Sequence, residues 1–298
     1  MARDNLELRA EVTSAPLAVA MITFNEAHNM EAVLADLRGF AREVLVVDSY
    51  STDATVDIAL AAGARVVQRR FRGFGDQWNF ALEALGQAQP WAMKLDPDER
   101  LSDTLKGSIR QALEAGDADG LVVRRRLWFL GRPLPVRQDI LRIWRAGACR
   151  FTDVEVNEQP VVAGALRRLE GDLEHHDSPS LDHWLAKQNA YTTAEARQLF
   201  EGVGAPARLW GGGSVARRAW AKRLFWRLPG RSVAMHAYCL LVQGAWRAGS
   251  TGFAWARLRA DLYRHIAYKL AEMRRRGGYA PSESGPRGAP HPQAEQCG

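Results

Sequence analysis

The sequence predicts an α/β fold in which a mainly parallel sheet carries helices on both faces, followed by a basic helical extension. Between residues 17 and 96, short apolar runs alternate with segments of helical spacing, and this alternation is typical of a parallel sheet covered by helices. The apolar runs have no polar face, which indicates strands that are buried on both sides. A chain of 298 residues, 47% of them hydrophobic, can also bury a substantial core.

The elements follow one another regularly in the first half. The predicted strands are 17–24, 43–49, 65–68 and 91–96, and the predicted helices are 26–40, 52–64, 75–87 and a segment that begins near residue 103. Ser102 or Asp98 can cap that last helix. In the second half we expect strands over 121–131 and 140–147 and a helix from Ser180 to about Phe200.

Charge divides the chain into two parts. The net charge is +6, but residues 207–276 hold 15 Lys and Arg against 2 Asp and Glu. We therefore expect an N-terminal arm (1–16), an α/β domain (17–206), a basic amphipathic helical region (207–276) and a disordered tail (277–298) that is rich in Gly and Pro. Aromatic residues interleave with the basic ones, which is typical of a surface that lies on anionic lipid. Nucleic acid could bind the same composition, and packing against the α/β domain could also explain the aromatics.

Several classes of protein are not supported by the sequence. The N-terminus carries charged residues and no apolar core, so no signal peptide is predicted. The longest run without a charged group, between Arg231 and Arg247, is too short and too polar to span a bilayer. Cys149, Cys239 and Cys297 lie far apart and support neither a disulfide framework nor a zinc site. A reducing, cytoplasmic location fits best.

Polar residues gather where the predicted strands end, and ligands of parallel sheets bind beyond that edge. The first strand leads to Thr23, Phe24, Asn25 and Glu26, the second to Asp48 and Ser49, and the fourth to Asp96 and Asp98. In an extended Asp-x-Asp one carboxylate can face a ribose while the other meets a divalent cation, Mg²⁺ or Mn²⁺. Such a cation would offset the repulsion among Asp96, Asp98 and Glu99. The alternative is ordinary turn and cap chemistry around Pro97.

Four motifs together resemble a known family. TFNE (23–26), VVDSYSTDAT (46–55), GFGDQWNFA (73–81) and KLDPDER (94–100) are similar, in order and spacing, to family 2 of the inverting glycosyltransferases. These enzymes have the GT-A fold, a mixed and mainly parallel sheet. The sequence resembles most the subfamily of lipopolysaccharide-core β-1,4-glucosyltransferases, in which Glu-Arg commonly follows the Asp-x-Asp. The resemblance covers roughly residues 17–200 and is looser in the basic region.

The resemblance implies roles for single residues. Thr23, Phe24, Asn25 and Glu26 would line the pocket for the nucleotide base, and Asp48, next to Ser49, would accept a hydrogen bond from a uracil-type N–H. The alternative is that Asn25 caps the first helix and Asp48 merely ends a strand.

The resemblance also implies a sugar and metal site. Gln77 and Asn79 would lie beside the sugar nucleotide, Asp96 would reach the ribose or the metal, and Asp98 would be the metal ligand. His175 would meet the diphosphate or the metal, with His176 as a competitor for that role.

Inversion at an anomeric carbon needs a carboxylate that takes the proton of the acceptor hydroxyl. The segment TDVEVNEQP offers candidates, and relatives often read Val-His-Glu at Val156-Asn157-Glu158. We therefore assign the base to Glu158, with Asp153 as the second choice. Asn157 in place of the histidine removes a group that could orient this carboxylate, and these acids could instead only solvate a turn.

The resulting prediction is an inverting transfer of a hexose, with glucose expected, from a UDP-sugar to a lipid-linked saccharide such as lipopolysaccharide core. The enzyme would lie on the cytoplasmic face of the inner membrane as a peripheral protein, without a nucleic-acid partner. A capsule, exopolysaccharide or glycolipid acceptor would fit the same residues. A nucleotidyltransferase is disfavoured because no Gly-rich phosphate loop follows the first strand. A non-catalytic membrane or nucleic-acid-binding scaffold is the remaining alternative.

Overall fold

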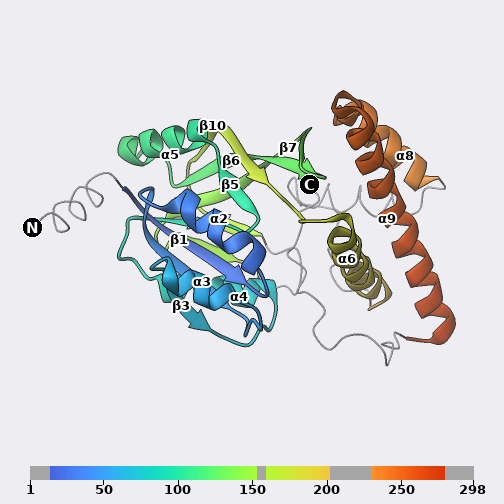
Figure 1. Cartoon of the computed structure of the whole chain (residues 1–298), viewed down its shortest axis with the longest axis horizontal. Helices are drawn as coiled ribbons and strands as arrows, with labels where there is room; N and C mark the ends of the chain where they lie inside the picture. Colours follow the sequence, from blue (N-terminus) through green and yellow to red (C-terminus); the bar gives the residue numbers. More distant parts are fainter. Residues whose placement is uncertain (1–13, 153–158, 202–229, 279–298) are drawn as a thin grey trace, which may run out of the picture. The chain divides into compact units, whose positions relative to one another are not determined.

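The computed structural model describes residues 14–152, 159–201 and 230–278. The described residues form two compact units, the first from residues 14–128, 137–152 and 159–177 and the second from residues 129–136, 178–201 and 230–278. Each unit is described by itself below, with elements labelled as in Figure 1.

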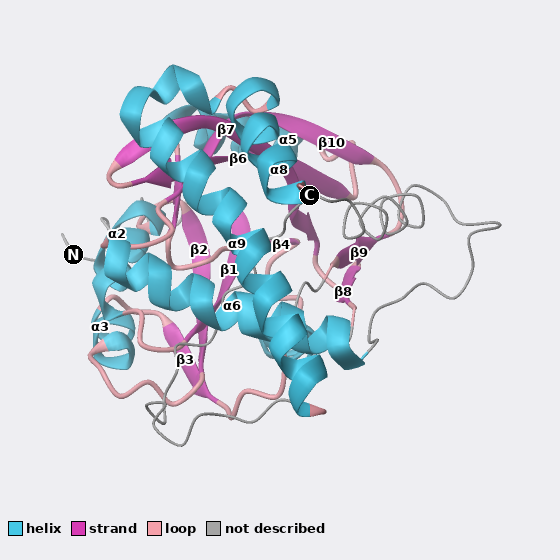
Figure 2. Cartoon of the chain, turned by 90° about the vertical axis from the view of Figure 1, so that its right-hand side faces the viewer, coloured by secondary structure: helices cyan, strands magenta, loops and turns pink. Residues whose placement is uncertain are grey.

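The first unit is built on one eight-stranded sheet with the order β3-β2-β1-β4-β7-β6-β10-β5. The strands are β1 (Ala15–Thr23), β2 (Ala41–Asp48), β3 (Arg65–Gln68), β4 (Trp91–Lys94), β5 (Glu99–Leu101), β6 (Gly120–Phe129), β7 (Arg132–Arg145) and β10 (Leu166–His175). Residues 129–136, which hold the end of β6, the turn and the start of β7, belong to the second unit. A separate two-stranded ladder joins β8 (Cys149–Phe151) to β9 (Pro160–Val162) (Figure 2).

Parallel pairing dominates the half of the sheet that the alternating sequence predicts. β1 pairs in parallel with both β2 and β4, and β2 pairs in parallel with β3. The other half is mixed, because β4 pairs antiparallel with β7, β10 pairs parallel with β6, and β5 pairs antiparallel with β10. The predicted mixed and mainly parallel sheet is confirmed, and the carboxyl ends of β1, β2 and β4 meet at one edge.

Helices cover both faces of this sheet. The helices of the first unit are α2 (Ala27–Leu37), α3 (Thr55–Ala61), α4 (Phe74–Leu85) and α5 (Asp103–Ala115). One core cluster joins α2, α3 and α5 to side chains such as Val19 and Met21 of β1. The second cluster lies on the opposite face and joins Trp78 of α4 to Ala20 of β1. Alternate residues of one strand thus enter two cores, because side chains in a strand point to alternate faces.

The start of α5 lies against β10, and two residues explain the close approach. Ser102 caps the helix, as predicted, since its Oγ accepts from the backbone N–H of Leu105 at 3.3 Å. The same Oγ accepts from the backbone N–H of Asp172 at 3.1 Å. Gly171 has φ +89°, and a Cβ there would lie 2.3 Å from the backbone nitrogen of Leu105. Only glycine fits this crossing.

Apart from residues 129–136 at the end of the β6–β7 hairpin, the second unit is helical in its described part. Its elements are α6 (Leu181–Glu201), α8 (Arg231–Ala237), a π-helical turn η1 (Tyr238–Val242), a 3₁₀ turn η2 (Ala245–Ala248) and α9 (Gly249–Arg276). α9 packs against both α6 and α8 (Figure 1). Ser180 caps α6 as predicted, because its Oγ accepts from the backbone N–H of His183 at 3.1 Å. The predicted helix over 180–200 is confirmed.

A lysine joins α6 to α9. Nζ of Lys269 lies 2.7 Å from both the backbone oxygen and Oδ1 of Asn189, 2.8 Å from Oγ1 of Thr192 and 2.7 Å from Oγ1 of Thr193. Burial lowers the pKa of Lys269 to about 8, with Glu272 partly opposing that effect.

The helices of the described residues include none with both the length and the apolar composition that a membrane span requires.

Candidate active site

Asp48, at the end of β2, joins the loops at the carboxyl edge of the sheet. It is fully buried and lies opposite Thr23 in the pairing of β1 with β2. Its carboxylate accepts from Oγ1 of Thr23 at 3.0 Å, from the backbone N–H of Ser51 at 2.8 Å, from Oγ of Ser51 and from Nε2 of Gln68 at 3.1 Å. Several hydrogen bonds are what a buried carboxylate requires. One side chain thus fixes the exits of β1, β2 and β3.

The TFNE segment is held by the loop after β2. Asn25 has φ 55°, and its Oδ1 accepts from the backbone N–H of Thr52 at 2.8 Å. The N–H groups that open α2 are satisfied instead by the second loop, because Oγ1 of Thr55 accepts from Glu26 at 2.8 Å and Oδ2 of Asp53 accepts from Ala27 at 3.1 Å. The alternative that Asn25 caps this helix is therefore wrong. Phe24 and Glu26 are half-buried at the same edge.

Ser49 and Gln77, which the resemblance places in the sugar-nucleotide site, contact each other. Nε2 of Gln77 donates to Oγ of Ser49 at 3.3 Å, and Oε1 of Gln77 accepts from Nη1 of Arg69 at 3.1 Å. Arg69 also pairs with Asp76 at 2.7 Å. The start of α4 is thereby tied to the loop after β2 and to the residue after β3.

Asn79, in contrast, faces the β8–β9 ladder. Its Nδ2 donates to the carbonyl of Phe151 at 3.0 Å, and its Oδ1 accepts from the backbone N–H of Phe151 at 2.9 Å. One amide therefore satisfies both backbone groups of Phe151. The described contacts of Asn79 position β8, and its predicted place beside the sugar nucleotide stays a prediction.

The Asp-Pro-Asp-Glu segment forms a tight turn between β4 and β5. The backbone N–H of Asp96 donates to Oε2 of Glu99 at 3.0 Å, and the N–H of Glu99 donates to the carbonyl of Asp96 at 3.0 Å. The N–H of His176 donates to the carbonyl of Asp98 at 2.8 Å. The strand predicted to reach Asp96 ends at Lys94, because the chain turns there to pair β5 with β10.

Arg142 of β7 balances two of the three acidic charges. Its Nη2 lies 2.8 Å from Oδ2 of Asp96 and 2.5 Å from Oε1 of Glu99, and Arg125 lies 4.0 Å from the same Glu99 oxygen. Burial raises the pKa of Asp96, but Arg142 and Lys94 outweigh burial and hold that pKa below its usual value. Within the described residues, Arg142 therefore offsets part of the repulsion at Asp96 and Glu99 that the sequence analysis assigned to a cation.

Asp98 faces a different set of groups. Nε2 of His175 lies 3.3 Å from its Oδ2, and one ligand atom each from Asp98, His175 and Asp177 fall within 4.8 Å of one another. All three residues are buried. Burial lowers the pKa of His175, but the charge of Asp98 outweighs burial and raises that pKa overall. Two carboxylates and an imidazole are a donor set that Mn²⁺ or Mg²⁺ accepts, so these residues fit a divalent cation.

This group differs in two respects from the predicted metal ligands Asp98, Asp96 and His175, which stay a prediction. Asp177, which the sequence reasoning missed, joins Asp98 and His175, whereas the carboxylate of Asp96 lies on Arg142. The spacing His175-x-Asp177 after a strand repeats the alternation of Asp96-x-Asp98 and could have drawn attention to it. His176 lies elsewhere, with its ring 4.4 Å from that of Trp128.

Both predicted bases, Glu158 and Asp153, lie outside the described residues. The flanks of their segment are described. Phe151 pairs with Pro160, the N–H of Thr152 donates to the carbonyl of Gln159 at 3.1 Å, and Oγ1 of Thr152 accepts from the N–H of Gln159 at 2.9 Å. The two ends of the segment are therefore held together, beyond the ladder that Asn79 anchors.

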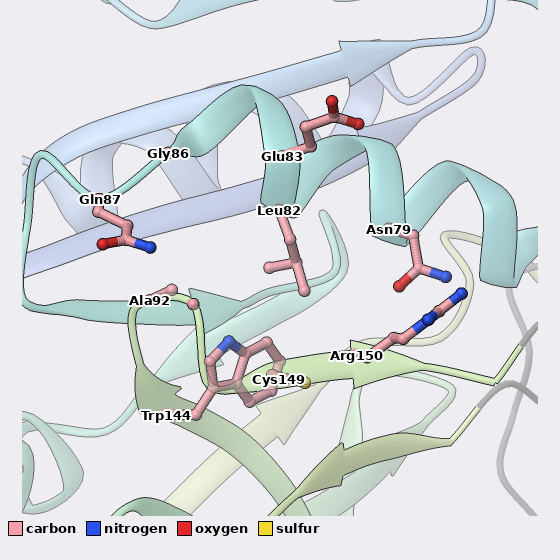
Figure 3. Close-up of a pocket in the computed structure, with 10 residues that line it drawn as sticks. Asn79, Leu82, Glu83, Gly86, Gln87, Ala92, Trp144, Cys149 and Arg150 are labelled. Atoms are coloured by element: carbon pink, nitrogen blue, oxygen red, sulfur yellow. The ribbon is translucent and has the colours of Figure 1, made fainter.

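A hollow of about 520 Å³ lies along α4 beside β8. Figure 3 shows Leu82 and Asn79 pointing from α4 toward the strand that carries Cys149 and Arg150. Ala92, at the amino end of β4, and Gly86, after α4, also line it. The hollow therefore lies toward the opposite end of β4 from the acidic turn. Burial raises the pKa of Cys149 to about 12, so this thiol is a poor nucleophile.

Comparisons with known proteins identify the family of the chain. Residues 18–168 match the model of glycosyl transferase family 2. Over 198 residues the chain is 33% identical to a lipopolysaccharide core biosynthesis glycosyltransferase, LpsC, from Rhizobium meliloti (strain 1021), covering 62% of this chain and 72% of that protein. It is 27% identical over 208 residues to an uncharacterized glycosyltransferase from Rickettsia bellii (strain RML369-C), covering 64% and 70% of the two chains.

Among solved structures, Staphylococcus aureus TarS is 15% identical with a TM-score of 0.43, covering 85% of this chain and 55% of that one. Glucosyl-3-phosphoglycerate synthase from Mycobacterium tuberculosis, solved with Mn²⁺, uridine diphosphate and glucosyl-3-phosphoglycerate, is 23% identical with a TM-score of 0.30, covering 39% and 45%.

The family model matches more than half of the chain, so the protein belongs to glycosyl transferase family 2 and is a glycosyltransferase. The resemblance drawn from the four motifs is thereby confirmed. The mixed, mainly parallel sheet with helices on both faces is the GT-A fold that the family predicts.

Proposed function

We propose that this glycosyltransferase moves a hexose, with glucose expected, from a UDP-sugar to a lipid-linked saccharide such as lipopolysaccharide core, with inversion at the anomeric carbon. The observation that carries the proposal is the buried Asp98–His175–Asp177 group beside the Asp-x-Asp turn, in a chain of this family. The relative named for lipopolysaccharide core biosynthesis supports the class of acceptor.

The donor site would lie at the carboxyl edge of β1, β2 and β4. Phe24, Asn25 and Glu26 are half-buried there and would face the nucleotide base. Asp48 already accepts four hydrogen bonds, so a uracil N–H would have to displace one of its donors. We therefore expect Asp48 to act chiefly by fixing the loops that line the base pocket.

Asp98, His175 and Asp177 would hold a divalent cation, Mg²⁺ or Mn²⁺. Such a cation would supply positive charge that stabilises the leaving diphosphate. Asp96 would face the ribose, and Arg142 would keep its carboxylate ionised and fixed in direction. This division gives the two aspartates of the turn separate tasks.

The transfer itself is a single displacement. The acceptor oxygen forms a bond to the anomeric carbon, the bond from that carbon to the phosphate oxygen breaks, and UDP leaves with the bonding electron pair. The proton of the acceptor hydroxyl passes to a carboxylate of the 153–158 segment, for which Glu158 remains the first choice and Asp153 the second. The residues that flank that segment, Thr152 and Gln159, are joined by hydrogen bonds at the end of the β8–β9 ladder.

A lipid-linked acceptor implies that the enzyme works at a membrane surface. We propose peripheral association through the basic region 207–276, on the cytoplasmic face of the inner membrane. Residues 230–276 of this region belong to the described part of the chain, and residues 207–229 do not. Its excess of Lys and Arg over Asp and Glu supports attraction to anionic lipid.

The test is a transfer assay with purified protein, UDP-glucose, Mn²⁺ and a truncated lipopolysaccharide acceptor. We expect UDP release that needs both metal and acceptor, and a product whose anomeric configuration is opposite to that of the donor sugar. Asp57→Asn, which changes an exposed acid on α3, is the control and should retain activity. Retention of the donor's configuration, or absence of transfer from every nucleotide diphosphate sugar tried, would contradict the proposal.

A further inference from the structure

Four of the large apolar side chains that the second unit exposes lie close together in sequence around one chain reversal, whereas others, such as Val233 of α8 and Tyr268 of α9, lie elsewhere in the unit. Leu241 and Val242 end η1 and are 74% and 72% exposed, and Trp246 of η2 and Phe253 of α9 are both 51% exposed. We call these four residues the hairpin tip. Gly244, with φ 72°, reverses the chain between η1 and η2. Four large apolar side chains left in water within thirteen residues indicate an interaction surface.

The residues of η1, η2 and α9 that are not exposed pack tightly against one another. Cys239, Ala245 and Ala256 are almost fully buried beneath the hairpin tip. A Cβ at Gly252 would lie 1.8 Å from the carbonyl oxygen of Ala245, so α9 crosses η2 at the closest possible distance. Small residues already fill the interior beneath the hairpin tip. The four exposed side chains are therefore not the result of incomplete packing.

The segment that carries the hairpin tip is basic, and of its arginines Arg257 pairs with Asp261, just beyond the segment, at 3.4 Å. No Asp or Glu occurs between residues 231 and 260, whereas Arg231, Arg247, Arg257 and Arg259 do. The guanidinium carbon of Arg247 lies 5.4 Å from the ring centroid of Trp246. Apolar side chains with tryptophan among them, bordered by arginine, are typical of proteins that enter the headgroup region of an anionic bilayer.

We propose that the hairpin tip inserts into the headgroup region of an anionic membrane and is the principal membrane contact of the described chain. The inference rests on the proposed function for its purpose, since a lipid-linked acceptor lies at that surface. It also narrows the sequence prediction, which spread the contact over all aromatic residues of the basic region. Trp255, one of those residues, is only 6% exposed and packs inside the unit.

A second copy of the chain is a poorer occupant. A symmetric contact through this surface would bring the arginines of one copy against the same arginines of the other, since a two-fold interface pairs the same patch with itself. Like charges so placed oppose association. Phosphate groups of lipid headgroups meet the same arginines with opposite charge.

The test is cosedimentation of the full-length protein with vesicles of phosphatidylcholine and phosphatidylglycerol, compared with phosphatidylcholine alone. Leu241→Ser/Val242→Ser should lower the partition coefficient on the mixed vesicles by about tenfold or more, because two large apolar side chains lose their burial in lipid. The matched control is Leu60→Ser/Val161→Ser, which changes the same two residue types at exposed positions of the first unit, 55% and 57% exposed. It should stay within about twofold of the parent protein.

Three results would overturn the inference. In the first, the double variant binds the mixed vesicles as strongly as its control. In the second, the parent protein binds neutral and mixed vesicles equally. In the third, the parent protein is a dimer, and the double variant is a monomer that still binds the mixed vesicles. A UDP and Mn²⁺ titration of the same proteins separates this inference from the proposed function. Failure of nucleotide binding with intact vesicle binding would count against the donor site alone, and the opposite pair of results against the hairpin tip alone.

Discussion

The carboxyl edge of the sheet buries charged side chains, whereas the hairpin tip exposes apolar ones. Both are the reverse of the usual distribution, in which charged side chains are exposed and apolar side chains are buried. At the edge, Asp48, Glu99 and Arg142 are at most 3% exposed. At the tip, Leu241 and Val242 are more than 70% exposed. Buried charge and exposed apolar surface both cost free energy in the isolated chain. Each therefore indicates where the molecule is organised for a ligand rather than for its own stability.

The two regions differ in whether other groups of the chain offset this unfavourable free energy. At the edge, each described acid has a partner of opposite charge or a set of donors, as with Asp96 on Arg142 and Asp98 on His175. At the tip, a lipid surface would have to cover the apolar groups. Substitutions at the edge should consequently lower folding stability, whereas substitutions at the tip should affect membrane binding and leave stability nearly unchanged.

The largest effect on stability is expected at Arg142. Arg142→Met leaves the carboxylate of Asp96 buried without its main counter-charge and removes the hydrogen-bond donor of Glu99, whose pKa burial raises, so we expect the free energy of unfolding to fall by about 3–5 kcal/mol. Urea denaturation measures it. Arg168→Met, which breaks an exposed pair with Asp139, is the control and should cost about 1 kcal/mol or less. Equal losses in the two variants would contradict the account of the buried turn.

Asn79 should give the next largest effect. Asn79→Ala removes both hydrogen bonds to the backbone of Phe151 and leaves that backbone unsatisfied, which should cost about 1–3 kcal/mol of unfolding free energy. Glu83→Ala, one turn further along α4 and exposed, should change it by about 0.5 kcal/mol or less. If Asn79→Ala abolished donor binding without loss of stability, Asn79 would serve the sugar nucleotide rather than β8.

The smallest effect concerns Lys269, whose pKa of about 8 lies below its ordinary value of 10.5 because of burial. Between these two values the unfolded chain binds more protons than the folded one, so this lysine makes stability rise as the pH increases. Because the side chain is only half-buried, we expect less than about 4 °C in Tm between pH 7.5 and 9.5.

The measurement for Lys269 is the difference in Tm between the parent protein and Lys269→Gln across that pH range. It should shift in favour of the parent protein as the pH rises. Arg274→Gln removes an exposed charge that does not titrate there, so its difference should stay constant. A constant difference for Lys269→Gln as well would show that its ammonium form is not disfavoured by burial.

The sequence predicted those parts of the site that follow from a single strand and its exit. The alternation of apolar runs placed Thr23 and Asp48 at one edge, and the structure pairs them through a hydrogen bond. The motifs likewise placed Gln77 near Ser49. Such residues can be predicted because the carboxyl ends of parallel neighbours must lie together.

The missed residues come from strands whose neighbours the sequence does not reveal. Arg142 reaches Asp96 because β7 pairs antiparallel with β4, and the two residues lie 46 positions apart. Asp177 reaches Asp98 because β10 pairs with β5 after the turn. Neither pairing leaves a periodic signal, since antiparallel additions to a parallel sheet depend on tertiary packing. The exposure of the hairpin tip also depends on packing, because the apolar residues at 239 and 245 are buried and those at 241 and 242 are not.

The central claim is that the acidic turn and its neighbours bind a nucleotide diphosphate through a divalent cation. Calorimetric titration of the purified protein with UDP, with and without Mn²⁺, tests it most directly, alongside Asp98→Asn and the exposed control Asp103→Asn. The account predicts micromolar binding by the parent protein and the control only when Mn²⁺ is present, and a loss of about 100-fold or more in Asp98→Asn. Binding of equal strength in all three proteins, or no binding of any nucleotide diphosphate, would contradict it.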